Sequence, residues 1–143
     1  MNTTWVLIAN GSEARLFEKQ NNPLHLSLIK QFSHPQSRDK GLDLATDRAG
    51  HFNGDTSKAA HGSFNEATSP KQYELERFAQ ILSNELDAAR NENRYNKLIL
   101  VSSPHFHGLL NKHMNGNVTK MVAKHIEKDY TELKAEELLE RIR

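Results

Sequence analysis

A long amphipathic stripe followed by a short apolar run constrains the fold of this chain most strongly. Ser69-Pro70-Lys71-Gln72 matches a capping box in which Gln72 reaches back to the cap, and Asn91-Glu92-Asn93 marks the end of the helix. The apolar positions follow the helical period: Leu75, Phe78, Ala79, Leu82, Leu86 and Ala89. The run 98–101 then predicts a buried strand. Because a strand reached through a helix pairs in parallel, the sequence predicts an α/β fold.

Strand-like segments precede this helix and predict a meander. The run 5–9 is apolar on both faces, which is typical of an inner strand. Asn10-Gly11 tolerate positive φ and predict a tight hairpin turn into a returning strand at 14–19. Leu24, Leu26 and Leu28 alternate with polar residues, so we expect a third strand with one strongly apolar face.

The remainder of the chain predicts two more helices around a last strand. Ser103-Pro104 starts a helix, and Asn115-Gly116-Asn117 is typical of a left-handed stop. The segment 118–127 fits either a strand or a helix, and the strand is favoured. The apolar positions expected to face the core are Phe106, Leu109, Leu110 and Met114, then Ala135, Leu138, Leu139 and Ile142. The expected architecture is a single α/β domain over 1–143, a mixed sheet of about five strands in β-β-β-α-β-α-β-α order, flanked by helices.

A long segment without regular hydrophobic period lies between these halves. It runs from Ser33 to Ser69 and carries four of the seven glycines. Compact domains rarely keep an unstructured connection longer than about 12 to 15 residues unless it is functional or disordered. We therefore expect this loop to be mobile when unbound and to carry the function or lie beside it.

Composition excludes several classes of protein. The chain has 19 Lys and Arg against 18 Asp and Glu, so no overall charge draws it to nucleic acid or to a membrane. It contains no Cys, which excludes thiol catalysis and disulfides. The N-terminus carries no basic region followed by a long apolar segment, so we expect a cytoplasmic protein without membrane insertion.

The helix start at Ser103-Pro104 is a candidate anion site, because it follows a buried strand and presents free backbone N–H groups. A serine that only caps its own helix is the favoured alternative. His105 and His107 point about 200° apart on a helix, so they do not chelate one ion. These residues therefore give a contact site at most.

Metal and catalytic patterns are weak. Asp47, His51, Asp55 and His61 offer ligands without a recognised spacing, so we expect no metal and no cofactor. No paired carboxylates or nucleophile with an evident base occur, so the catalytic residues are unknown; whether the protein is an enzyme stays open, and a role without catalysis is favoured.

The loop also carries a combination of residues that suits RNA. Arg38, Lys40, Arg48 and Lys58 lie among Phe52 and Phe64, and such residues neutralise phosphates and stack on bases. Acidic residues outnumber these cations, which leaves a merely solvated loop as the alternative. The candidate ligand or RNA contacts are Arg48, Gly50, His51, Phe52, Lys58, Ser103 and His105.

A family resemblance covers nearly the whole chain. It rests on residues 5–11 with 14–17, Gly50-His51-Phe52, Glu76-Arg77-Phe78-Ala79 with Leu82 and Leu86, Pro104 with Gly108 and Leu110, and Lys128-Asp129-Tyr130-Thr131. In this order and spacing the chain resembles the host attachment protein family, proteins required for attachment to host cells. The resemblance implies a fold like the middle domain of archaeal and eukaryotic release factors, whose loop before the long helix promotes peptidyl-tRNA hydrolysis.

The chain departs from that pattern at several positions. Release factors carry Gly-Gly-Gln in the loop, whereas no two glycines are adjacent here, so hydrolysis is not carried over. His51 stands where Arg often follows the loop glycine, His107 replaces an aliphatic residue, and Asn111 replaces an Arg. The resemblance implies a ribosome- or RNA-associated binding module in translation. An adhesion-related factor acting through a protein partner is the alternative, and an unrecognised hydrolase is less favoured.

Overall fold

The computed structural model describes residues 2–37 and 69–143, in which five strands form one mixed sheet of order β3-β2-β1-β4-β5. The strands are β1 (Thr4–Ala9), β2 (Glu13–Gln20), β3 (His25–Ser33), β4 (Lys97–Ser102) and β5 (Val122–Ile126). β1, β2 and β3 pair antiparallel, whereas β4 pairs in parallel with both β1 and β5. The predicted α/β class and strand number are confirmed.

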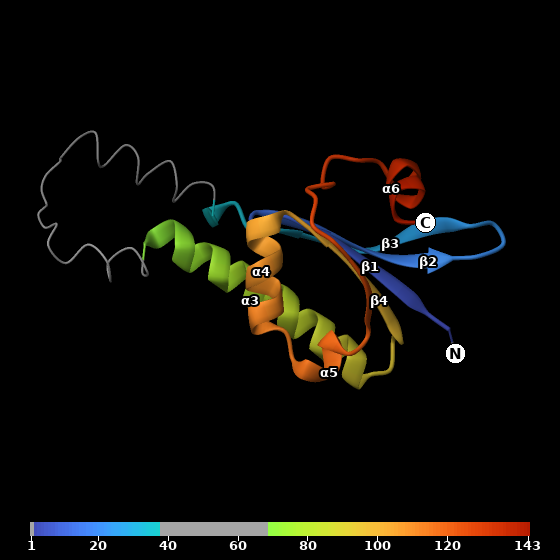
Figure 1. Ribbon diagram of the computed structural model, residues 1–143, viewed down its shortest axis with the longest axis horizontal. Coiled ribbons are helices and arrows are strands. Elements are labelled where there is room, and N and C mark those ends of the chain that lie inside the picture. Colours follow the sequence, from blue (N-terminus) through green and yellow to red (C-terminus); the bar gives the residue numbers. More distant parts are fainter. Residues whose placement is uncertain (1, 38–68) are drawn as a thin grey trace, which may run out of the picture.

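Helices cover both faces of the sheet (Figure 1). They are α3 (Pro70–Asn91), α4 (Pro104–His113), α5 (Gly116–Thr119) and α6 (Ala135–Ile142). Trp5, Leu7 and Ala9 pack in one core with residues of α3, α4 and α5, whereas Val6 and Ile8 pack in a second core with α6. This alternation explains why the first strand is apolar on both sides, because each of its faces meets helices.

The amphipathic stripe of α3 is the centre of the larger core. Phe78 and Leu82 are each 1% exposed, and the Phe78 ring stacks on Phe106 of α4 with centroids 5.6 Å apart. The helix begins at the predicted cap, where the Ser69 side chain accepts a hydrogen bond from Gln72 N. The predicted return bond from the Ser69 N–H to Gln72 does not form among the described residues, and the Gln72 Nε2 atom donates to Glu76.

The turn between β1 and β2 differs from the expected one. Within the described ranges positive φ among non-glycine residues occurs at Asn22 and Asn93, and Asn10 does not share it. The Asn10 side chain instead accepts hydrogen bonds from the backbone N–H groups of Ser12 and Glu13. An Asx turn, closed by a side chain, therefore replaces the expected left-handed turn.

The third strand forms, but its expected apolar face does not. Leu26 is buried, whereas Leu24 and Leu28 are 39% and 50% exposed. A register shift between Leu16 and Phe17 interrupts the pairing of β2 with β3, and it places Leu28 opposite Phe17. Leu26 and Leu28 still alternate, because their partners Lys19 and Phe17 are two residues apart on β2. Leu28 is exposed on the edge strand of the described sheet, so its face stays uncovered there.

The predicted stop after α4 is also wrong. Met114 ends the helix in an extended conformation, and Asn115 caps the short helix α5 with its side chain. Val118 belongs to α5 and β5 begins at Val122, so the segment 118–127 contains both of the alternatives, a helical turn and a strand.

Among the helices of residues 2–37 and 69–143, none has both the length and the apolar character that a membrane span needs. Residues 38–68 of the predicted loop lie outside the described residues.

Candidate functional site

The carboxyl ends of the two central parallel strands meet at one edge of the sheet. Ala9 of β1 is in register with Ser102 of β4, and Ser103 N donates a hydrogen bond to Ala9 O. From there β1 turns into β2 within the sheet, while β4 continues into α4 on one face. Crevices outside the carboxyl ends of such strands are the usual ligand sites of open α/β sheets. We call this region, residues 10–12, 102–103 and 127–131, the carboxyl edge.

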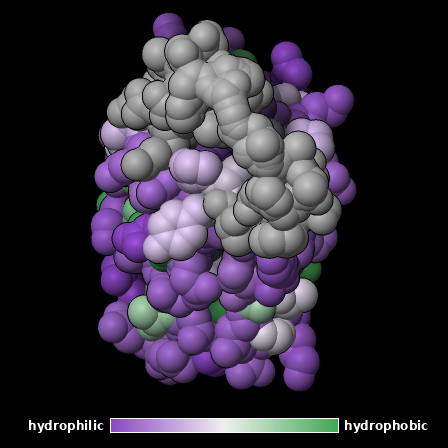
Figure 2. Space-filling view, turned by 90° about the vertical axis from the view of Figure 1, so that its left-hand side faces the viewer, coloured by the Kyte–Doolittle hydropathy of each residue, from purple (hydrophilic) through white to green (hydrophobic). Residues whose placement is uncertain are grey.

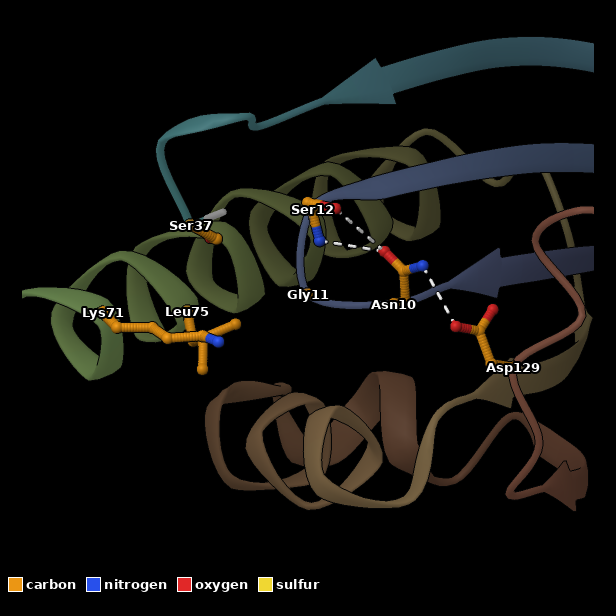
Figure 3. A pocket seen from close by; sticks show the side chains of 7 residues that line it. All are labelled: Asn10, Gly11, Ser12, Ser37, Lys71, Leu75 and Asp129. Atoms are coloured by element: carbon orange, nitrogen blue, oxygen red, sulfur yellow. Dashed lines mark hydrogen bonds between the residues drawn. The ribbon is translucent and has the colours of Figure 1, made fainter. Parts of the chain in front are cut away.

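A hollow of about 320 Å³ lies at this edge (Figure 3). Its described lining comes from the β1–β2 turn, the segment after β3, the first turns of α3 and the segment after β5: Asn10, Gly11, Ser12, Ser37, Lys71, Leu75 and Asp129. We call it the turn pocket. Figure 2 views the molecule from the end where α3 begins, and the described surface there is mostly hydrophilic.

Asn10 connects the walls of the turn pocket. Its Oδ1 atom accepts from Ser12 N at 2.9 Å, and its Nδ2 atom donates to Asp129 Oδ2 and to Thr131 Oγ1, both at 3.1 Å. Arg15 of β2 supports the same wall, because it donates to the backbone oxygen of Thr131 at 2.6 Å. The segment after β5 is therefore fixed against the β1–β2 turn.

Asp129 is held as a carboxylate. Burial acts to raise its pKa, but hydrogen bonds from the Thr131 hydroxyl, the Thr131 backbone and Asn10 lower the pKa below its ordinary value. The Asp129 Oδ1 atom accepts both bonds from Thr131, whereas Oδ2 accepts from Asn10. A carboxylate oxygen has about two acceptor positions, so Oδ2 keeps capacity for a further donor.

Ser37 is held at the pocket through His34, which contacts both the β1–β2 turn and α3. His34 N donates to Ser12 O, and Ser37 N donates to His34 O. The His34 ring stacks on Phe78 and lies 2.9 Å from a Glu74 carboxylate oxygen. Ser37 itself is 2% exposed, and its Oγ atom has no hydrogen-bond partner among the described residues.

Lys71 contributes the positive charge of the pocket. It lies exposed in the first turn of α3, next to the Pro that begins the helix. Within the described part of the chain Lys71 forms no ion pair. Its charge adds to the positive end of the α3 dipole.

A hydrogen-bonded chain of side chains lies on the neighbouring strands. Ser102 Oγ is 2.5 Å from His107 Nδ1, and His107 Nε2 is 2.9 Å from His125 Nδ1. Ser102 and His107 are buried, whereas His125 is exposed. Burial and the neighbouring His125 lower the pKa of His107, and Glu127 acts in the opposite direction. These three hydrogen-bonded side chains link β4, α4 and β5. Ser102 is 0% exposed, so its hydroxyl has no access to a substrate.

Of the contact residues predicted from the sequence, the structure describes Ser103 and His105. Arg48, Gly50, His51, Phe52 and Lys58 lie outside the described residues, so their role stays a prediction. Ser103 is the cap residue of α4, but within the described part of the chain its side chain makes no capping hydrogen bond. His105 is exposed and His107 is buried, as their spacing predicts.

Sequence reasoning missed most of the pocket. Asn10, Ser37, Lys71 and Asp129 were not among the candidate contacts, and neither was the pairing of His107 with His125. Two signals were available: Asn10 directly follows a buried strand, and Asp129 belongs to a segment that carries the family resemblance. No group of three or more His, Asp or Glu residues suited to a metal ion occurs in the described ranges.

The sequence matches the family described as "Protein required for attachment to host cells" over residues 5–142. The chain belongs to this family. The match confirms the resemblance seen in the sequence, while the further relation to release factors stays a prediction.

Other comparisons add little. No curated protein matches the chain significantly. Among solved structures, the type II variant of the Aquifex aeolicus Ppx/GppA phosphatase is similar, with 12% identity and a TM-score of 0.42. The match covers 88% of this chain and 36% of the phosphatase, so the chain spans about a third of that structure's length. This likeness is too weak to support a function.

Proposed function

We propose that this member of the host attachment family is a binding module for RNA, free or in the ribosome, and that it lacks peptidyl-tRNA hydrolase activity. The carboxyl edge is its contact surface. One observation carries the proposal: the starts of α3 and α4 both lie at this edge. Lys71 of α3 shares a pocket with Asn10, and Ser103 of α4 bonds to the adjacent Ala9.

Helix starts suit phosphate groups. Their free N–H groups point outward, and the helix dipoles add partial positive charge. The Ser103 hydroxyl makes no capping bond within the described ranges, so the helix start does not fix its orientation and both its oxygen and its O–H can serve a ligand. The net charge is +1, so attraction to RNA depends on these local features.

Absence of hydrolysis is the second part of the proposal. The sequence lacks adjacent glycines and therefore Gly-Gly-Gln. Ser102 is hydrogen-bonded to His107, as a nucleophile would be to a base, but it is fully buried. A binding role fits these features better than catalysis.

A protein-binding role is the second candidate, and one surface favours it. β3 is an edge strand of the described sheet, and Leu24 and Leu28 at its start are exposed. An exposed strand edge with apolar side chains can take a further strand from a partner. An adhesion-related factor acting through a protein partner would use this edge.

Sedimentation through ribosome gradients separates the two candidates. The RNA proposal predicts that the full-length protein co-sediments with ribosomes or binds single-stranded RNA at low salt, and that raising the salt releases it. Binding through the β3 edge predicts little effect of salt, and Leu28→Lys would disrupt it. If micromolar protein binds neither ribosomes nor RNA at low salt, the RNA proposal is wrong. Cell fractionation tests the cytoplasmic location that this role requires.

A further inference from the structure

The turn pocket contains a buried hydroxyl without a partner. A buried polar group that makes no hydrogen bond costs free energy, and native structures satisfy most such groups. In the described ranges the buried serine hydroxyls without a partner are those of Ser37 and Ser83. Ser37 lines a pocket, whereas Ser83 lies in α3. A ligand in the turn pocket would supply the partner that Ser37 lacks.

The two ends of the pocket carry opposite charges. Lys71 lies on the side of Ser37, while Asp129 lies on the other side beyond Asn10 (Figure 3). The Lys71 end therefore combines an ammonium group, a hydroxyl donor and the start of α3, which together suit an anion. The Asp129 end offers a carboxylate oxygen with spare acceptor capacity, which suits a hydroxyl or amino donor.

The size of the pocket limits the ligand. Its volume of about 320 Å³ is at the lower end of the range of roughly 300 to 1,000 Å³ that small-molecule pockets occupy. Leu75 gives the pocket an apolar wall, and its Cδ2 atom lies so close to Gly11 that a Cβ there would be 2.4 Å from it. The pocket therefore suits one small molecule that carries an anionic group, hydroxyl donors and a flat apolar part.

We propose that the turn pocket binds a single ribonucleoside monophosphate unit, either a free nucleotide or the phosphorylated end of an RNA. The phosphate lies at the Lys71 and Ser37 end, and a ribose hydroxyl donates to Asp129. The Leu75 wall receives part of the base. This assignment rests on the RNA role proposed above, since it names the unit of RNA that the pocket takes.

Titration of the full-length protein with AMP, adenosine, dAMP and inorganic phosphate tests the assignment. Calorimetry or NMR shifts of the pocket residues report the binding. We expect AMP to bind about tenfold or more tightly than adenosine and than phosphate, because each lacks one half of the contacts. We expect dAMP to bind more weakly than AMP, since it lacks one hydroxyl donor. Equal affinity for AMP and adenosine would overturn the proposal.

Matched variants assign the binding to the pocket. Lys71→Gln and Ser37→Ala should each lower the affinity for AMP about tenfold, which corresponds to the loss of one hydrogen bond to a charged group. Lys97→Gln is the control for charge, because Lys97 is exposed at the first residue of β4, at the end of the strand away from the carboxyl edge. Ser83→Ala is the control for the loss of a buried, unpaired hydroxyl. Wild-type affinity in both pocket variants would exclude this site.

RNA oligomers with and without a 5′ phosphate distinguish the two sources of the nucleotide. Stronger binding of the phosphorylated oligomer, lost in Lys71→Gln, indicates that the pocket takes an RNA end. Binding of AMP without any binding of RNA supports the pocket as a nucleotide site and overturns the proposed function. Binding of RNA that neither AMP nor the pocket variants affect overturns the pocket assignment and leaves the proposed function standing.

Discussion

The Nε2 atom of His107 lies 2.9 Å from the Nδ1 atom of His125, so the charge of one ring acts directly on the other. Because His107 is also buried, its pKa is below the ordinary value of 6.5. As the pH falls below 6.5, His107 therefore takes up a proton less readily in the folded protein than in the unfolded chain. The contribution of His107 to stability is present above pH 6.5 and is lost as the pH falls from there through the folded pKa.

NMR titration of the histidine rings checks this prediction. In the wild type the His107 signals should titrate below pH 6.5. In His125→Gln the pKa should rise, since the repulsion is removed, but it should stay below 6.5 because His107 is still buried. A His107 pKa at or above the ordinary value in the wild type would contradict the described burial.

A second pH effect is expected where α3 meets the end of α4. The hydrogen bond with His113 is the strongest of the effects that lower the pKa of Glu76 from 4.5 to about 2, Lys112 and Gln72 add to it, and burial opposes it. Glu76 therefore contributes stability that is present above about pH 4.5 and is lost as the pH falls toward about 2.

Acid unfolding of Glu76→Gln measures this contribution. Between pH 5 and pH 2 the stability of the variant should fall less steeply than that of the wild type, because one depressed carboxylate is absent. Glu132→Gln, at an exposed position before α6, is the control and should keep the wild-type slope. If both variants have the wild-type slope, the contact with His113 does not couple to folding.

Replacement of Phe78 by Ala should lower the free energy of unfolding by about 3 to 5 kcal/mol, since it leaves a cavity between α3, α4 and the sheet. Ile81→Ala on the same helix is the control, because Ile81 is 40% exposed, and a change within about 0.5 kcal/mol is expected there. Denaturant unfolding followed by circular dichroism compares the two. Equal costs would show that the stripe does not face the core.

Replacing the buried serines Ser83 and Ser102 by Ala should change the free energy of unfolding in opposite directions. Ser83→Ala removes an unpaired hydroxyl and improves helix propensity, so it should stabilise the protein by about 1 kcal/mol. Ser102→Ala removes the partner of His107 Nδ1 and leaves that buried atom unpaired, so it should destabilise by about 1 to 3 kcal/mol. Thermal unfolding of both variants tests the contrast, and a loss of stability in Ser83→Ala would contradict it.

The loop cations give a prediction from the sequence alone. Changing Arg48 and Lys58 together to Ala should lower the affinity for RNA and reduce the slope of log affinity against log salt by up to about 1.4, since about 0.7 is lost with each single-strand phosphate contact. Lys97→Ala with Lys120→Ala removes the same charge elsewhere and should leave the slope unchanged. An unchanged slope in the loop variant would exclude these cations as RNA contacts.

Local patterns were sufficient for much of the fold. The spacing of Phe78, Leu82 and Leu86 identified the buried face of α3, because the helical period alone decides which side chains share a face. The apolar run of β4 after that helix required a parallel neighbour, and β1 is that neighbour. The exposure of Leu28 could not be predicted in this way, since it depends on the place of β3 at the edge of the described sheet.

The sequence by itself determined the five strands, the helices α3, α4 and α6, the mixed sheet and the family, because each depends on residues that are near one another in the chain or on motifs in a fixed order. Only the tertiary structure decided the site. Asn10 and Asp129 are 119 positions apart and meet because β1, β4 and β5 end at one edge. His107 and His125 meet because β5 pairs with β4 in a particular register. Contacts of this kind follow from strand order and register, which no local pattern of residues specifies.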